Sequence, residues 1–221
     1  MLGYNVLITT SNAHDISELQ SLVESNRVDG MLLTRALEDD RALQYFKSGK
    51  FPDSTDGNMR YDNIIQVDTD NEGAAEKMTT LLIGKGFRRF AFLVKDMSYN
   101  VDRKRHEGFC RALIKNGISE KDQLFYNGSI RMEFLDAIIE NIISKKVECI
   151  ICGDDEICTM VMSRLQAEGY RIPKDVAIAS LYNSTNLDCY SPAVTAVSVA
   201  ASQMGGTAVR QLIQRLRRGK L

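Results

Sequence analysis

The sequence has no tryptophan, only two histidines and only three prolines among its 221 residues. The histidines, His14 and His106, stand in different contexts, and neither an HxxH pattern nor a phosphate-binding GxxxxGKS/T pattern is present. No apolar run approaches the ~20 residues that a membrane-spanning helix needs, and the N-terminus lacks the charged and apolar regions of a secretion signal. These absences argue against an enzyme, a cofactor-binding protein or a membrane protein, and we expect the chain in the cytoplasm.

The net charge and the cysteine content argue against nucleic-acid binding, membrane binding and a disulfide framework. The formal net charge of -1 gives no general electrostatic attraction to nucleic acid or to an anionic membrane. The five cysteines are odd in number and stand in apolar contexts, which is typical of reduced core thiols and not of a disulfide framework. Cys149 and Cys152 have CxxC spacing, but residues three apart on a strand point to opposite faces and cannot bind one metal ion. We therefore predict no metal site.

The most informative stretch runs from Val147 to Met160 (VECIICGDDEICTM). Its first part is a continuous apolar run, which is typical of a strand buried on both faces of a parallel sheet. The run stops at Gly153, and a helical pattern begins after Asp154 and Asp155. In open α/β sheets ligands bind beyond the carboxyl ends of the strands, so these aspartates are candidate ligand contacts. An equally good interpretation is that one of them only caps the helix.

The rest of the chain alternates between strand and helix patterns, which predicts an α/β fold with parallel sheets. We expect strands at residues 4–9, 28–34, 64–67, 90–94, 124–126, 147–152 and 176–181. We expect helices at residues 15–26, 37–47, 71–85, 105–116, 132–145 and 204–218, besides the one after Asp154. Gly86 and Gly117 are expected to cap two of them. The polar stretch FPDSTDGNMR (51–60) is expected to be a loop, because it cannot form a buried strand.

Four blocks of the sequence carry a family resemblance. They are VDTDNEGAAEKMTTLLIGKGFRRFAFL (67–93), RKRHEGFCRALIKNGI (103–118), ECIICGDDEICTMVMSRLQAEGYRIPKDVAIAS (148–180) and CYSPAVTAVSVAASQMGGTAVRQLI (189–213). In this order they resemble the effector-binding domain of the LacI/GalR transcription regulators, which is itself similar to periplasmic sugar-binding proteins. The resemblance covers nearly the whole chain.

The resemblance implies two Rossmann-like lobes with parallel sheets, joined by crossover strands, with a small effector bound in the cleft between them. The lobes would be residues 1–87 plus 193–221 and residues 88–192. Compared with the family pattern, the chain lacks the first strand and helix and the last strand. The DNA-reading helix-turn-helix that the resemblance implies would lie before residue 1.

Five residues correspond to effector-binding positions of the family. Arg105 stands three positions before Gly108, as the family's effector-contacting arginine does, and a guanidinium there can hold a hydroxyl pair or a carboxylate. Asp70 matches an acidic position that reaches the cleft, and Asp154 a position usually held by asparagine. Where the family commonly has an aspartate, this chain has Tyr182 followed by Asn183. A tyrosine ring there could stack on a sugar face or a base, which argues against a plain monosaccharide effector.

We therefore expect an effector-sensing domain of a LacI-type regulator, which binds a sugar or a related metabolite and alters the affinity for operator DNA. The alternative is a free-standing solute-binding protein of the same fold, which a secretion signal in the full gene would support. An enzyme is the least favoured reading. The resemblance also implies a homodimer, and apolar residues beyond the needs of one buried helix face (Leu37, Leu43, Tyr45, Phe46 and the cluster 138–143) are in keeping with it.

Overall fold

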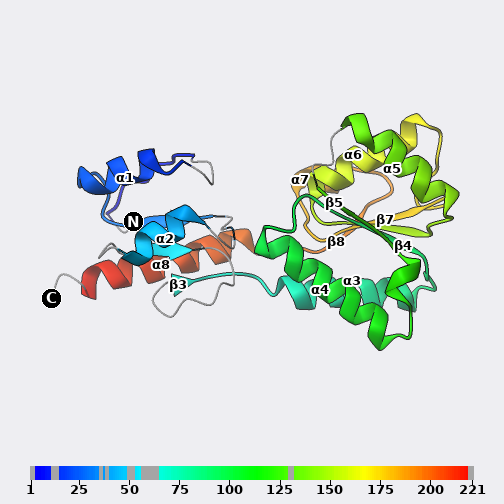
Figure 1. The fold of residues 1–221 in the computed structure, drawn as a ribbon, viewed down its shortest axis with the longest axis horizontal. Helices are drawn as coiled ribbons and strands as arrows, with labels where there is room; N and C mark the ends of the chain where they lie inside the picture. Colours follow the sequence, from blue (N-terminus) through cyan, green and yellow to red (C-terminus); the bar gives the residue numbers. More distant parts are fainter. Residues whose placement is uncertain are drawn as a thin grey trace. The chain divides into compact units, whose positions relative to one another are not determined.

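The computed structural model describes residues 3–10, 15–34, 37, 40–48, 53–55, 65–128 and 132–218 (Figure 1). The chain divides into two compact units, and we call Met1–Val67 with Ser202–Leu221 unit 1 and Asp68–Ala201 unit 2. The resemblance implied boundaries near residues 87 and 193 instead. The units divide elsewhere because helix α3 (Asn71–Gly84) packs along helix α4 (Asn100–Lys115) inside unit 2.

Unit 2 is built on a five-stranded parallel sheet in the order β5-β4-β6-β7-β8. The strands are β4 (Phe90–Val94), β5 (Leu124–Asn127), β6 (Cys149–Cys152), β7 (Ala177–Ser180) and β8 (Thr195–Ala196). The three inner strands β4, β6 and β7 are buried along their whole length. Their continuous apolar runs are what a sheet covered on both faces requires, so the predicted α/β class is confirmed.

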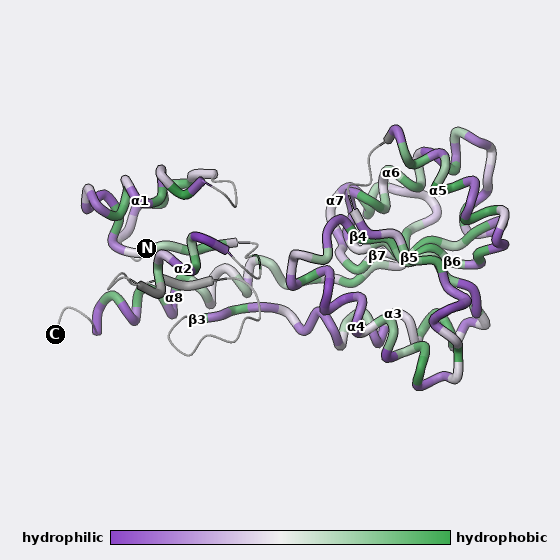
Figure 2. The backbone as a smooth tube through the Cα atoms, in the orientation of Figure 1, coloured by the Kyte–Doolittle hydropathy of each residue, from purple (hydrophilic) through white to green (hydrophobic). Residues whose placement is uncertain are grey.

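Helices cover both faces of this sheet (Figures 1 and 2). Helices α3 and α4 pack on one face, while α5 (Met132–Ser144) and α6 (Asp155–Ala167) pack on the other. Cys149 lies in the core under α3 and α4, and Cys152 in the core under α5 and α6. The prediction that the two cysteine side chains point to opposite faces of the strand is confirmed. Two short helices, η1 (Glu120–Asp122) and α7 (Thr185–Asp188), complete the unit.

The predicted helix ends are confirmed at both glycines. Gly86 has φ +103° and Gly117 has φ +67°, a left-handed conformation that costs glycine little. At the end of α3 the N–H of Phe87 reaches back to the carbonyl oxygen of Leu82 at 3.3 Å, while Gly86 donates to Ile83 at 3.0 Å. This pair of bonds satisfies carbonyl groups that the helix itself leaves open.

Unit 1 contains a three-stranded parallel sheet in the order β1-β2-β3. The strands are β1 (Met31–Leu33), β2 (Asp53–Thr55) and β3 (Ile65–Gln66), and the helices are α1 (Ser17–Glu24), α2 (Arg41–Ser48) and α8 (Ala201–Arg218). The prediction of a loop over residues 51–60 is wrong for β2, which is the middle strand. Backbone pairing with two neighbours forms this strand, and residue propensity is too weak to oppose it. The other residues of that stretch lie outside the described residues.

The predicted buried strand at residues 4–9 is also wrong. The segment is not a strand, and Val6 and Ile8 are 85% and 86% exposed. An apolar run becomes a buried strand only where a neighbour takes its backbone hydrogen bonds. The described strands of unit 1 pair with one another and not with this segment.

The residues that suggested an association surface are largely core residues. Leu43 and Phe46 are buried in unit 1, and Ile139 and Ile142 are fully buried under the unit 2 sheet. These four side chains therefore cannot form a surface patch, whereas Tyr45, Ile138 and Ile143 are only partly buried. Among the described residues, no helix is both long and apolar enough to cross a bilayer.

Candidate functional site

The strand order of unit 2 points to one place on its sheet. From β4 the chain passes through α4 to β5 on one side, and it then returns through α5 to β6 on the other side of β4. The helix that follows β4 (α4) therefore packs on one face of the sheet, and the helix that follows β6 (α6) packs on the other. Such a topological switch point opens a crevice beyond the carboxyl ends of the two strands, where ligands of open α/β sheets bind. The residues at this point are Lys95 after β4 and Gly153 and Asp154 after β6.

Asp154 and Lys95 form an ion pair across this switch point. The Lys95 ammonium lies 3.0 Å from Asp154 Oδ2 and also pairs with Glu156 in the first turn of α6. Asp154 Oδ1 accepts the N–H of Ile157 at 2.9 Å, so Asp154 caps α6, but its ion pair shows that capping is not its only contact. Burial lowers the pKa of Lys95, but hydrogen bonds to Glu156 and Asp154 outweigh this effect, and the pKa lies above its usual value.

Arg105 is buried at the same switch point. It is only 7% exposed, and its Nη1 donates to the carbonyl oxygen of Gly153 at 2.8 Å. The alternative of a solvated helix arginine is therefore wrong. A Cβ on Gly153 would lie 3.1 Å from the carbonyl oxygen of Leu93, and the Gly153 N–H donates to that oxygen at 2.7 Å. The turn after β6 thus lies directly against the end of β4.

The loop after β4 is braced from two sides. The buried carboxylate of Asp102 on α4 accepts the backbone N–H of Asp96 at 3.1 Å. Asn127, the last residue of β5, accepts the N–H of Met97 at 3.1 Å through its side-chain oxygen. Backbone groups that a loop would leave open are satisfied by side chains here, which fixes the position of Lys95.

Tyr182 and Asn183 follow β7, which is the next strand along the sheet edge. The hydroxyl of Ser180 donates to the carbonyl oxygen of Tyr182 at 2.6 Å and so fixes the turn. The Asn183 side chain donates to Asp188 in α7 at 3.0 Å, and its backbone N–H donates to the carbonyl oxygen of Val197 at 2.8 Å. Asn183 therefore holds the ends of β7 and β8 together.

Asp70 lies at a different part of the edge. Its Oδ1 accepts the N–H of Gly73 at 2.8 Å and caps α3, and a Cβ at Gly73 would lie 2.1 Å from Asp70 Oδ2. Asp70 also borders a cavity of about 420 Å³ between α3 and the segment after β8. The cavity is lined by Thr69, Asp70, Asn71, Ala74, Lys77, Met78, Leu81, Leu181, Val197, Ser198, Val199 and Ala200. This volume lies in the range of small-molecule sites.

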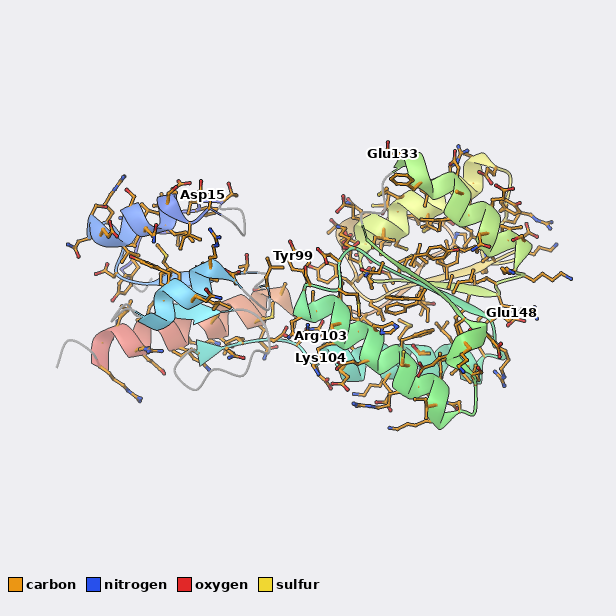
Figure 3. The ribbon with its side chains drawn as sticks, in the orientation of Figure 1. Asp15, Tyr99, Arg103, Lys104, Glu133 and Glu148 are labelled. Atoms are coloured by element: carbon orange, nitrogen blue, oxygen red, sulfur yellow. The ribbon has the colours of Figure 1, made fainter. Side chains whose placement is uncertain are left out.

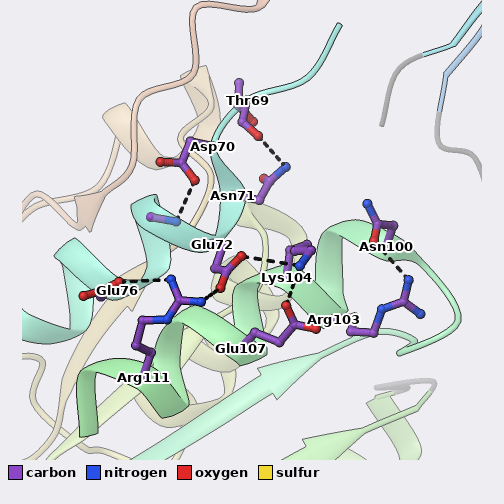
Figure 4. Close-up of polar contacts among 11 residues, drawn as sticks. Thr69, Asp70, Asn71, Glu72, Glu76, Asn100, Arg103, Lys104, Glu107 and Arg111 are labelled. Atoms are coloured by element: carbon purple, nitrogen blue, oxygen red, sulfur yellow. Dashed lines mark hydrogen bonds and ion pairs between the residues drawn. The ribbon is translucent and has the colours of Figure 1, made fainter. Parts of the chain in front are cut away.

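Ion pairs between charged side chains join α3 to α4 (Figure 4). Glu72 pairs with Lys104 and Arg111, and Glu76 pairs with Arg111 and Lys115. Figure 3 shows Tyr99, which precedes the first residue of α4, and Lys104, which belongs to that helix. The two helices that carry Asp70 and Arg105 are thereby held as one body.

The five predicted residues thus fall into three groups on one sheet edge. Arg105 bonds to Gly153, the residue before Asp154, at the switch point, Tyr182 and Asn183 follow β7, and Asp70 borders the cavity. Lys95 is the residue that the sequence reading missed. It follows the apolar run FAFLV just as Asp154 follows CIIC, so the same strand-end argument would have found it. Within the described part of the chain, no group of three or more His, Cys, Asp or Glu side chains is placed to bind a metal ion.

Comparison with known proteins identifies the family. Residues 79–220 match the model of a periplasmic binding protein-like domain. The chain belongs to this family. It is 25% identical to the HTH-type transcriptional regulator CelR of Thermobifida fusca over 216 residues, which make up 96% of this chain and 64% of CelR. The chain therefore spans less than two thirds of the length of that relative.

Solved structures of this periplasmic binding protein-like family agree with the assignment. A transcription regulator like protein from Staphylococcus haemolyticus is 28% identical, with a TM-score of 0.89 over 97% of this chain and 79% of the other. A complex of the transcriptional regulator CelR with cellobiose is 25% identical, with a TM-score of 0.79 over 92% of this chain and 64% of the other. The resemblance of the four sequence blocks to LacI-type regulators is confirmed.

Proposed function

We propose that this chain is the effector-sensing domain of a LacI-type transcriptional regulator, and that its effector is a sugar or a related polyhydroxylated metabolite. The observation that carries the proposal is the Lys95–Asp154 ion pair at the switch point, supported from below by the buried Arg105. Charged donors and acceptors fixed on strand ends are what recognition of ligand hydroxyl groups requires. The cellobiose complex of the related CelR supports a saccharide.

Each proposed contact residue has a distinct role. Asp154 accepts hydrogen bonds from ligand hydroxyl groups, and the Arg105 guanidinium, which also bonds to Gly153, donates to the ligand. The Tyr182 ring offers a flat apolar face on which a sugar ring can stack. Asp70 accepts from a ligand group in the cavity beside α3. Asn183 acts through backbone and α7 contacts that place Tyr182.

The response to the effector depends on the two places where the chain passes between the units, after Val67 and after Ala201. A ligand shifts an equilibrium between two arrangements only by the difference in its contacts with each. We propose that such a shift alters the affinity for operator DNA, which binds to a segment outside this chain, and that the regulator acts as a homodimer.

A thermal-shift screen of sugars, sugar phosphates, nucleosides and amino acids tests the binding function. A ligand at about 100 times its dissociation constant should raise the free energy of unfolding by about 2.7 kcal/mol. The full-length protein then tests regulation, because the same ligand should change its affinity for operator DNA. A ligand that binds tightly and leaves DNA affinity unchanged would favour a free-standing solute-binding protein. A monomer in light scattering of the full-length protein would contradict the dimer.

A further inference from the structure

The Lys95–Asp154 pair has unused hydrogen-bonding capacity. The Lys95 ammonium has three N–H donors and pairs with two carboxylates, Asp154 and Glu156. The Asp154 carboxylate has about four acceptor positions, and it accepts from Ile157 and Lys95. Both side chains remain partly accessible, at 30% and 18% exposure. The pair therefore offers the crevice a donor and an acceptor side by side.

The charges around the pair favour an uncharged ligand. Three carboxylates, Asp154, Asp155 and Glu156, stand in succession at the start of α6, and Asp96 follows Lys95 directly. A ligand phosphate or carboxylate brought to this edge would meet four carboxylates against two cations, Lys95 and Arg105, and Lys95 is already paired with two of the carboxylates. A hydroxyl group brings no charge, and it can accept from the ammonium or donate to a carboxylate.

We propose that Lys95 is a specificity-determining residue of the effector site. It makes the site select an uncharged ligand with two neighbouring hydroxyl groups, one of which accepts from the Lys95 ammonium while the other donates to Asp154. This inference rests on the proposed function and assigns to Lys95 a role that goes beyond holding α6 against the end of β4.

The competing explanation is that Lys95 is only a structural ion pair. That role predicts that Lys95→Met lowers stability and leaves ligand affinity unchanged. The specificity role predicts a loss of affinity in protein that is still folded. Lys104 provides a matched control, because it is 32% exposed and also pairs with two carboxylates, Glu72 and Glu107, yet it lies on the α3 side of α4.

The test is calorimetric titration of the wild type, Lys95→Met, Lys95→Arg and Lys104→Met with cellobiose, glucose and glucose 6-phosphate. We expect the wild type to bind a neutral sugar at least about tenfold more tightly than the phosphate. Lys95→Met should weaken neutral-sugar binding by at least about tenfold, which corresponds to about 1.4 kcal/mol. Lys95→Arg should recover part of this affinity, and Lys104→Met should stay within about twofold of the wild type.

A double-mutant cycle with Asp154→Asn tests the shared contact, because asparagine still caps a helix. The effects of Lys95→Met and Asp154→Asn on affinity should be clearly non-additive if one diol spans both side chains. Unchanged affinity in folded Lys95→Met, additive effects in the cycle, or a wild-type preference for the phosphate would overturn the assignment while the sensing function stands. Folded wild type that binds none of the three sugars would overturn this inference, and the screen above would then decide the proposed function separately.

Discussion

The guanidinium of Arg105 and the carbonyl oxygen of Gly153 are joined by a hydrogen bond of 2.8 Å between residues 48 apart in sequence. The bond connects α4 on one face of the sheet to the turn that starts α6 on the other. Arg105 is therefore part of the framework of the crevice as well as a candidate ligand contact. Because Arg105 is buried, its truncation should affect the fold as well as ligand binding.

Arg105→Ala should lower the free energy of unfolding by about 1.5–3 kcal/mol, because a hydrogen bond to a charged group is lost and the Gly153 carbonyl is left without it. It should also abolish effector binding. Urea denaturation and calorimetric titration measure the two effects. Arg103→Ala is the control, since this partly exposed arginine bonds to Asn100 and should cost about 0–1 kcal/mol. Equal stability of the two variants would contradict the framework role.

Gly108→Ala should force α3 and α4 apart. A Cβ at this position would lie 2.1 Å from the carbonyl oxygen of Glu72, and the ion pairs between the helices oppose their separation. We expect a loss of about 1–3 kcal/mol, as for other overpacked sites. Gly84→Ala, at the end of α3 where a Cβ meets nothing within 4 Å, should instead stabilise by up to about 1 kcal/mol. Thermal and urea unfolding of both variants check the contrast.

Asp70 combines a helix cap with a place in the cavity wall, and two substitutions separate these roles. Asp70→Ala should cost about 0.5–2 kcal/mol, because the N–H of Gly73 loses its acceptor. Asp70→Ser should retain most of this stability, since serine caps well, but it should weaken effector binding through the lost charge. Effector affinity of Asp70→Ser equal to that of the wild type would show that Asp70 only caps α3.

His106 makes stability depend on pH. The ring is half-buried against Phe125, at 4.2 Å between ring centroids, and burial lowers its pKa, while Glu120 and Glu107 partly oppose the shift. The folded state then binds its proton less readily than the unfolded chain, whose histidine has a pKa of about 6.5. The stability that neutral His106 contributes to the fold is therefore fully present above about pH 6.5, and it is lost as the pH falls below this value.

Replacing His106 with leucine should therefore reduce the loss of unfolding free energy between about pH 7.5 and about pH 5.5. Urea midpoints of the wild type and His106→Leu at both pH values measure the difference. An identical pH dependence in the two proteins would show that other groups dominate in this range. Asp175, whose pKa hydrogen bonds from Arg171 lower to about 2, contributes only at more acidic pH.

The sequence predicted the elements of unit 2 well because each one follows a local rule. Phe90–Val94 and Cys149–Cys152 are apolar on both faces, as a covered parallel sheet requires, and Gly86 and Gly117 stop helices at the expected positions. Unit 1 was harder, because its strands depend on neighbours that are distant in sequence. The polar segment Asp53–Thr55 is a strand through its partners, and the apolar run at residues 4–9 is not a strand because the described strands offer it none.

In the candidate site, too, contacts between residues that are distant in sequence could not be predicted. Asp154 could be placed at a strand end from its own surroundings, but its ion pair with Lys95 joins residues 59 positions apart that only the β4–β6 pairing brings together. The burial of Arg105 likewise depends on where the turn at Gly153 lies. A helical arginine looks the same in sequence whether water or a carbonyl group receives its N–H groups.

The division of the chain has a consequence for its synthesis. Unit 2 is one continuous segment, Asp68–Ala201, while unit 1 is completed by α8 at the far end of the chain. Leu212, Ile213 and Leu216 of α8 are buried, and Leu212 lies 3.0 Å from where a Cβ on Gly30 would stand. A ribosome therefore synthesises every residue of unit 2 before it has made the helix that completes unit 1. Domains usually fold in the order of synthesis, but here the segment that is made second is the one whose residues are all complete first.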